Sequence, residues 1–283
     1  MRHSTVFLDR SWRVGLVLVA LALVTLACGF EGGAFGSTPE PSGTNRAVTP
    51  AVNSAPAGTV PDLAQGPAEA ILITSPQPGQ GVRGTFRIEG VSDPALAQQL
   101  NLVVRDAKGT VLATARPTTQ AAANQRSAFS AEIVLPPEVP HQTGRVQVYA
   151  VSPDNHGVTH LTSVELDLNG DKQVAAVPID PQTPEAIAMI FPSPKAEVKG
   201  VVKVAAVTML GPKMAIEVRD ANNQTVGRVE QTVEQTAGTP AQVLAEVPIQ
   251  VSAAGPGRVL VYAVNARDGA TEHLSSVEVN LKP

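Results

Sequence analysis

From about residue 70 onward, apolar and polar residues alternate along short segments of the chain. Phe86 and Ile88 flank Arg87, and residues 277–281 read Val-Glu-Val-Asn-Leu. A period of two is typical of a strand that has one face on a core and the other in water. Turn-forming residues such as Asp-Gly separate these segments. The pattern predicts short β-strands throughout, and no segment has the period of a long amphipathic helix.

The sequence contains two copies of one repeat of about 100 residues. Five segments of the first copy match five of the second in the same order and at nearly the same spacing. The matched segments are 71–76 with 188–194, 82–88 with 198–204, 103–107 with 217–221, 144–151 with 257–264, and 160–166 with 273–279. About seven strands fit into each copy, which predicts an all-β protein with two tandem immunoglobulin-like β-sandwiches. The single cysteine and single tryptophan, Cys28 and Trp12, precede both copies, so neither copy has an antibody-type disulfide or core tryptophan.

The composition divides the chain into five parts. We predict a signal peptide at 1–27, a tether at 28–67, one sandwich at 68–169, a linker at 170–186 and a second sandwich at 187–283. The tether is rich in Pro, Gly, Ser and Thr, and its apolar surface is too small to offset the entropy of ordering it, so we expect disorder. Prolines break any strand in the linker. The sandwiches should therefore have some freedom unless an interface packs them together.

The first residues have the organisation of an export signal. Arginines precede an uncharged apolar run at 14–27, which at about 14 residues is shorter than the roughly 20 of a spanning helix. A basic start, a short apolar run and a small residue before the cut describe a signal peptide. An ordinary signal peptide cut near Ala27 and an uncleaved membrane anchor are the alternatives for this segment.

Residues 24–29, Val-Thr-Leu-Ala-Cys-Gly, resemble the bacterial lipobox. In that pattern a small residue precedes a cysteine whose sulfur receives a diacylglyceryl group before cleavage. The commonest form has Leu three residues before the cysteine and a small residue two before, whereas Thr25 and Leu26 stand here in exchanged order. The resemblance implies lipidation at Cys28 and an extracytoplasmic bacterial lipoprotein anchored to the cell membrane.

Both repeats share a further resemblance. Each has a strand that ends in Ser-Pro or Pro-Ser-Pro, a Val-x-Gly segment, Val-Arg-Asp, Gly-Arg-Val-x-Val-Tyr and a closing valine-rich strand. Together these resemble Gmad2, the immunoglobulin-like domain of bacterial spore germination. The resemblance implies an extracytoplasmic protein with no assigned catalysis. Members often carry a GerMN domain, which neither half of this chain resembles, so a germination role is kept as an alternative.

Charge and motifs exclude several classes of function. The formal net charge is −4 without a basic block, so no nucleic-acid partner is expected. The chain has no Gly-x-Ser-x-Gly, His-Glu-x-x-His, phosphate loop or zinc cysteine pair. We therefore expect neither an enzyme nor a cofactor. His160 and His273 recur at the start of the last strand, but no second His or Cys recurs beside them, so no metal site is expected.

Four residues are candidates for contact with a partner. If Val148 and its alternate neighbours face the core, Tyr149 and Tyr262 point to the opposite face, beside Arg145 and Arg258. Tyr and Arg are enriched in contact hot spots; the alternative is cross-strand packing on the outer face of the sheet.

The sequence thus predicts a non-enzymatic, lipid-anchored cell-surface protein that binds or scaffolds an envelope partner. A glycan- or peptidoglycan-binding module and a sporulation-related lipoprotein are the alternatives. Loss of Trp12 with the signal peptide would count against sugar stacking. The oligomeric state is not predicted.

Overall fold

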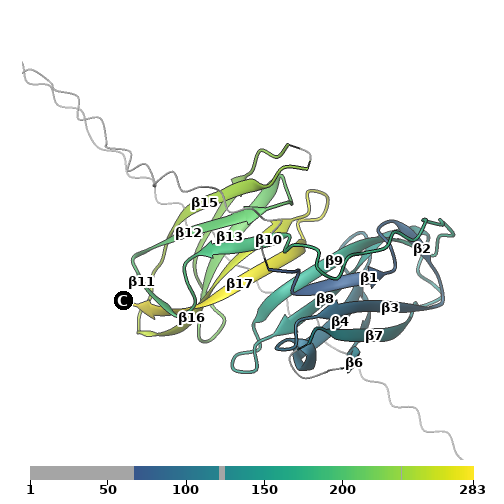
Figure 1. The fold of residues 1–283 in the computed structure, drawn as a ribbon, viewed down its shortest axis with the longest axis horizontal. Helices are drawn as coiled ribbons and strands as arrows, with labels where there is room; N and C mark the ends of the chain where they lie inside the picture. The colour runs from purple at the N-terminus through teal and green to yellow at the C-terminus, as the bar shows by residue number, and fades with distance from the viewer. Residues whose placement is uncertain (1–66, 121–124, 237) are drawn as a thin grey trace, which may run out of the picture. The chain divides into compact units, whose positions relative to one another are not determined.

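The computed structural model describes residues 67–120, 125–236 and 238–283. The signal peptide, Cys28 and nearly all of the tether lie outside the described residues. The described chain is all-β apart from one 3-10 turn at Ala97–Gln99 (Figure 1). Within the residues described, no helix has the length and hydrophobicity that a membrane span requires.

The first repeat forms a β-sandwich. One sheet has the strand order β1-β3-β7-β6, and the other contains β9-β8-β4-β5. Its strands are β1 (Ile71–Ser75), β2 (Gln80–Val82), β3 (Thr85–Ser92), β4 (Leu100–Arg105), β5 (Val111–Ala115), β6 (Thr118–Gln120), β7 (Ser127–Val134), β8 (Gln142–Val151) and β9 (Val158–Leu168).

The second repeat builds the same sandwich again. Its sheets have the orders β10-β12-β15 and β14-β13-β16-β17. Its strands are β10 (Ile187–Phe191), β11 (Ala196–Lys199), β12 (Val201–Thr208), β13 (Lys213–Asp220), β14 (Thr225–Thr232), β15 (Ala241–Pro248), β16 (Gly255–Val264) and β17 (Thr271–Lys282).

The strand count differs from the predicted seven per repeat, because the opening segment splits in two in both repeats and the first repeat adds the short strand β6. β1 pairs antiparallel with β3, and β2 then crosses to the other sheet and runs parallel to β9. β10 and β11 do the same against β12 and β17. Pro76 and Pro192 stand at the crossing, where proline interrupts the ladder because it has no N–H to donate. Gly84 and Gly200 then turn the chain into the next strand with positive φ, 53° and 65°.

The period of two correctly predicted which side chains face each core. Val146, Val148 and Ala150 of β8 belong to one buried cluster between the sheets of the first sandwich. The equivalent residues Val259, Val261 and Ala263 of β16 belong to a separate cluster in the second sandwich. Each repeat therefore has its own aliphatic core.

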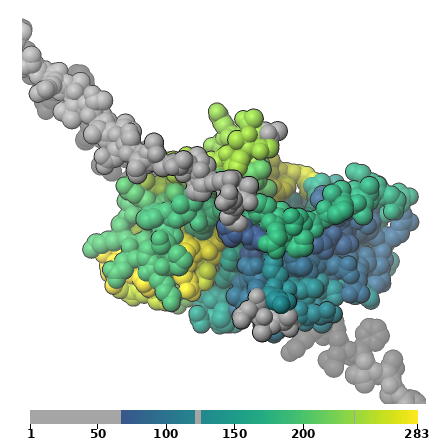
Figure 2. All heavy atoms as spheres, in the orientation of Figure 1, coloured from purple at the N-terminus to yellow at the C-terminus, as the bar shows by residue number. Residues whose placement is uncertain are grey.

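The two sandwiches meet edge to edge. β9 and β17 lie side by side (Figure 1), and Leu161 pairs with Leu274, so that strands of both repeats join in one ten-stranded sheet. The linker between them returns along the first sandwich (Figure 2). Gly81 N–H donates to the carbonyl of Lys172 at 2.8 Å, and Glu69 N–H donates to that of Thr183 at 2.8 Å. An interface thus packs the two repeats together.

Candidate functional site

The joint between the sandwiches is an apolar patch with polar side chains around it. The patch lies on the face of the ten-stranded sheet that points away from the two cores. It consists of the buried residues Leu161, Ala215, Leu260, Tyr262, Val264 and Leu274, with Tyr149 and Val158 packed against them. Since both repeats supply these residues, each sandwich covers part of the other.

The two candidate tyrosines lie in this patch. Both point away from their own core, as the alternation predicts, but the side chain of Tyr262 is buried rather than open to solvent. Its hydroxyl donates to Glu217 Oε2 at 3.0 Å. Burial, followed by the nearby Glu217 charge, raises the pKa of Tyr262 to about 12. Tyr262 therefore packs within the patch on the outer face of the sheet.

The two candidate arginines have different surroundings. Arg145 forms an ion pair with Asp268 of the second repeat, and the two side chains are only 3% and 6% exposed. Arg258 forms its bonds within its own sandwich, where it donates to Ser276 Oγ at 3.1 Å and pairs with Glu278 at 3.3 Å, although its charge also lies near His160 of the first repeat. Arg145 is therefore a contact between the sandwiches rather than part of an open surface.

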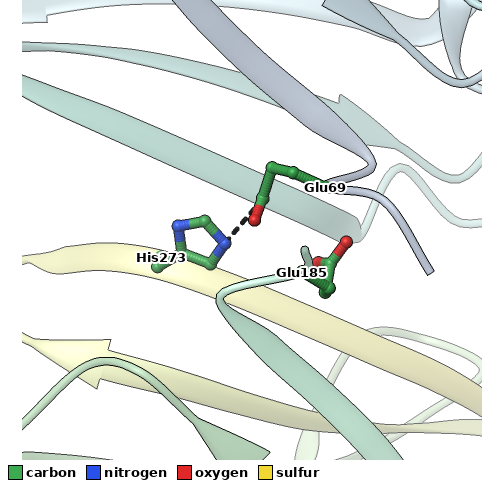
Figure 3. A group of neighbouring side chains, drawn as sticks. All are labelled: Glu69, Glu185 and His273. Atoms are coloured by element: carbon green, nitrogen blue, oxygen red, sulfur yellow. Dashed lines mark ion pairs between the residues drawn. The ribbon is translucent and has the colours of Figure 1, made fainter. Parts of the chain in front are cut away.

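An acidic and imidazole cluster closes one side of the joint. It contains Glu69, two residues before β1, Glu185, two residues before β10, and His273 of β17, all of them buried. One ligand atom from each lies within 4.8 Å of the other two. His273 Nε2 is 2.8 Å from Glu69 Oε1, and Figure 3 shows that carboxylate pointing toward the ring, with Glu185 beside them.

Each of the two glutamates accepts a hydrogen bond from the backbone N–H of the residue that follows the other. Ala186 N–H donates to Glu69 Oε2, and Ala70 N–H donates to Glu185 Oε2, both at 2.7 Å. The residues occupy equivalent places, because each repeat opens with Glu-Ala-Ile. The sequence comparison missed them because it began the match at Ile71, two residues after Glu69. The repeated Glu-Ala-Ile was the signal that could have found them.

The electrostatics of this cluster are unusual for carboxylates. Burial, followed by the neighbouring Glu69, raises the pKa of Glu185 to about 8. Arg126 lies nearby, donating to the main-chain oxygens of Glu69 and, at 2.7 Å, of Pro181. It also lies 3.6 Å from Asp93, whose pKa burial raises. One arginine and one imidazole thus face several carboxylates.

His160, the equivalent of His273, lacks such partners. Its Nδ1 is shielded from solvent and has no hydrogen-bond partner among the described residues. Burial, and then the charge of Arg258, lowers the pKa of His160 to about 4. The ring is therefore neutral near pH 7, and the two copies of this histidine differ in their surroundings.

A pocket of about 630 Å³ opens beside the cluster. Glu69 and His273 contribute to its wall, together with the apolar side chains of Leu72, Met209 and Pro240. Two carboxylates and an imidazole are a set of ligands that divalent metal ions accept. The pocket gives such an ion a route to the cluster.

The repeated Arg-Asp pairs lie at turns. Asp106 Oδ1 accepts the N–H groups of Lys108 at 2.8 Å and Thr110 at 2.7 Å. Asp220 repeats both bonds two and four residues further on. These aspartates therefore stabilise β-turns.

The fold defines the class of this protein as an all-β chain of immunoglobulin-like sandwiches. The sequence model of one family, the immunoglobulin-like domain of bacterial spore germination (Gmad2), matches residues 70–156, within the first repeat. No match was found among curated proteins.

Solved structures with similar arrangements share little sequence with this chain. An ICAM-5 D1–D4 ectodomain fragment is 14% identical, with a TM-score of 0.23. The match covers 75% of this chain and 53% of the fragment. The tandem V-type regions of VCBP3, a v-region-containing chitin binding protein, are 9% identical with a TM-score of 0.29, over 76% of this chain and 100% of that one. Trypsin-activated α2-macroglobulin from Escherichia coli is 13% identical with a TM-score of 0.27, and the match covers 77% of this chain and 16% of the macroglobulin. At these TM-scores the likenesses carry no functional argument.

Proposed function

We propose that this chain is a non-enzymatic, lipid-anchored protein outside the cell membrane, whose paired sandwiches bind or scaffold a protein of the cell envelope. The observation that carries the proposal is the family match at residues 70–156, since the family's domain belongs to bacterial spore germination. The lipobox-like segment that ends at Cys28 supports the location.

The anchor follows from the chemistry of a lipidated cysteine. Each buried methylene contributes about 0.8 kcal/mol to membrane binding, and one acyl chain alone holds only marginally. A cysteine that carries two or three chains gives durable attachment without a spanning helix. The residues at 28–67, rich in Pro, Gly, Ser and Thr, would then separate the sandwiches from the lipid surface.

An apolar row on the second sandwich supports a protein partner. Phe191 of β10 pairs with Ala205 of β12, which pairs with Leu244 of β15. The outer face of this sheet exposes 45% of Phe191 and 55% of Leu244. Exposed apolar side chains that gather in one place are typical of interaction surfaces.

The first sandwich has polar residues in the same places, where Ser75 pairs with Glu89 and Glu89 with Ser130. The apolar row is thus a property of the second repeat and not of the fold. A protein partner is favoured over a glycan because Tyr149 and Tyr262, the chain's two tyrosines, pack in the joint rather than offering rings for sugar stacking.

The anchor is tested with Cys28→Ala. We expect the variant to leave the membrane fraction and appear in the medium or periplasm, whereas the wild type sediments with membranes. Far-UV circular dichroism of the released protein should show unchanged β-structure. If the variant still sediments with membranes, the lipid anchor is wrong and an uncleaved anchor takes its place.

The partner surface is tested with the double variant Phe191→Ser and Leu244→Ser. We expect it to lose an envelope protein that the wild type captures by cross-linking in native membranes. Val134→Ser is the matched control, since Val134 is an exposed apolar residue of the first sandwich. Equal capture by all three proteins would contradict this surface.

A role in spore germination is the second candidate, and the description of the matched family favours it. In a spore-forming host, deletion of the gene should then slow germination, and the wild-type chain should restore it. Normal germination kinetics of the deletion strain would remove this candidate and leave the envelope role in place.

A further inference from the structure

We propose that Glu69, Glu185 and His273 bind one divalent transition-metal ion, of which zinc is the probe, at the joint between the sandwiches. The site would connect three segments: the residues that lead into β1, the end of the linker and strand β17. It is independent of the proposed anchor and partner.

The distances within the cluster fit one shared ion. The three ligand atoms lie within 4.8 Å of one another, and His273 Nε2 is already 2.8 Å from Glu69 Oε1. Zinc bonds to nitrogen and oxygen are about 2.0–2.2 Å long, so ligands of one ion lie roughly 3–3.5 Å apart. Small side-chain movements therefore bring all three atoms into the coordination range.

The backbone holds both carboxylates in place. Ala186 N–H fixes Oε2 of Glu69, and Ala70 N–H fixes Oε2 of Glu185. Oε1 of Glu185 is thus left for a ligand, and Oε1 of Glu69 faces His273 Nε2, the third ligand atom. Outer hydrogen bonds of this kind orient metal ligands in known sites.

An independent observation concerns Glu185, which is 6% exposed. Among the described residues its Oε1 accepts no hydrogen bond, and the nearest acidic neighbour is the buried Glu69 carboxylate. Ionising both of these buried acidic groups would place negative charge beside a single imidazole, and that charge is costly without a cation. A divalent ion would balance it, and the adjacent pocket of about 630 Å³ supplies access and room for a bound water.

The ligand types select the class of ion. Calcium and magnesium prefer six or more oxygen ligands, whereas this cluster combines two carboxylates with an imidazole. Imidazole suits zinc and its first-row neighbours. With three protein ligands and one water, the site would be four-coordinate.

The experiment uses the untagged full chain in detergent, freed of metal with EDTA. Isothermal titration calorimetry with zinc should show one ion bound per chain. Thermal denaturation should show a higher melting temperature with zinc than without it. Cobalt, which reports its geometry by visible absorption, should give the spectrum of a four-coordinate site that zinc then displaces.

Glu185→Gln is the decisive variant because it keeps the shape of the side chain and removes the repulsion from Glu69. The metal-free variant should be at least as stable as the wild type, so that lost binding cannot be attributed to unfolding. We expect zinc affinity to fall by more than about 100-fold, beyond the usual loss from an outer-shell change. His273→Gln should abolish the cobalt spectrum.

His141→Gln serves as the matched control, since it removes an exposed imidazole that pairs with Asp167 away from the joint. It should bind zinc as the wild type does. The proposal is overturned if the wild type binds no zinc, if Glu185→Gln and His273→Gln bind it as tightly as the wild type, or if calcium binds and zinc does not.

Discussion

Two copies of one repeat put the same residues into different surroundings. Arg145 and Arg258 are equivalent, yet the first forms a buried ion pair with the other repeat, and the second bonds within its own sandwich. His160 and His273 are equivalent too, but Glu69 pairs with His273, while His160 Nδ1 has no partner among the described residues.

The difference shows that contacts between repeats decide what a repeated side chain does. Edge-to-edge packing of β9 with β17 places Arg145 opposite Asp268 of the other repeat, whereas Arg258 lies beside Glu278 of its own β17. The Glu-Ala-Ile pair is the exception, since Glu69 and Glu185 each accept a hydrogen bond from the other's neighbour. Three substitutions test the comparison.

Arg145→Ala should have the largest effect. It leaves Asp268 buried without a counter-charge, and breaking a buried ion pair in this way costs about 3–5 kcal/mol. Arg258→Ala, its equivalent, removes a pair whose Glu278 carboxylate reaches solvent, and should cost about 1 kcal/mol or less. Urea denaturation measures both free energies of unfolding. Equal losses in the two variants would contradict the distinction between the repeats.

His160→Gln should change the pH dependence of stability. The pKa of His160 is lowered from 6.5 to about 4 in the folded protein, so between these values the unfolded chain binds more protons. The free energy of unfolding therefore falls as pH drops from about 6.5 to about 4, by about 3 kcal/mol from this residue. The variant should lack this part of the decline in denaturation curves recorded across that range. Parallel curves for variant and wild type would disprove it.

Tyr262→Phe should have the smallest of the three effects. It removes the hydroxyl that donates to Glu217 at 3.0 Å, a bond to a charged group worth about 1.5–3 kcal/mol. Tyr149→Phe is the matched control, because the Tyr149 hydroxyl makes no hydrogen bond among the described residues. Thermal denaturation should separate the two variants. A loss in Tyr149→Phe as large as that in Tyr262→Phe would refute the assignment.

Much of the fold could be predicted from local patterns. The alternation correctly placed Val146 and Val259 in cores. The split of the opening strand was not predicted, since the crossing between sheets depends on partners far along the chain. The cluster at Glu69 was missed because the comparison of the repeats began after the shared Glu-Ala-Ile, and because only the tertiary structure brings together residues more than 80 positions apart in sequence.

The sequence by itself determined that this protein folds into two sandwiches with separate aliphatic cores. A period of two is a local property, and each strand carries its own division into a buried and an open face. The tertiary structure alone decided which open faces are covered, and so which tyrosines, arginines and histidines are buried. The physical reason is that burial at the joint depends on how β9 meets β17, and no single repeat contains that information.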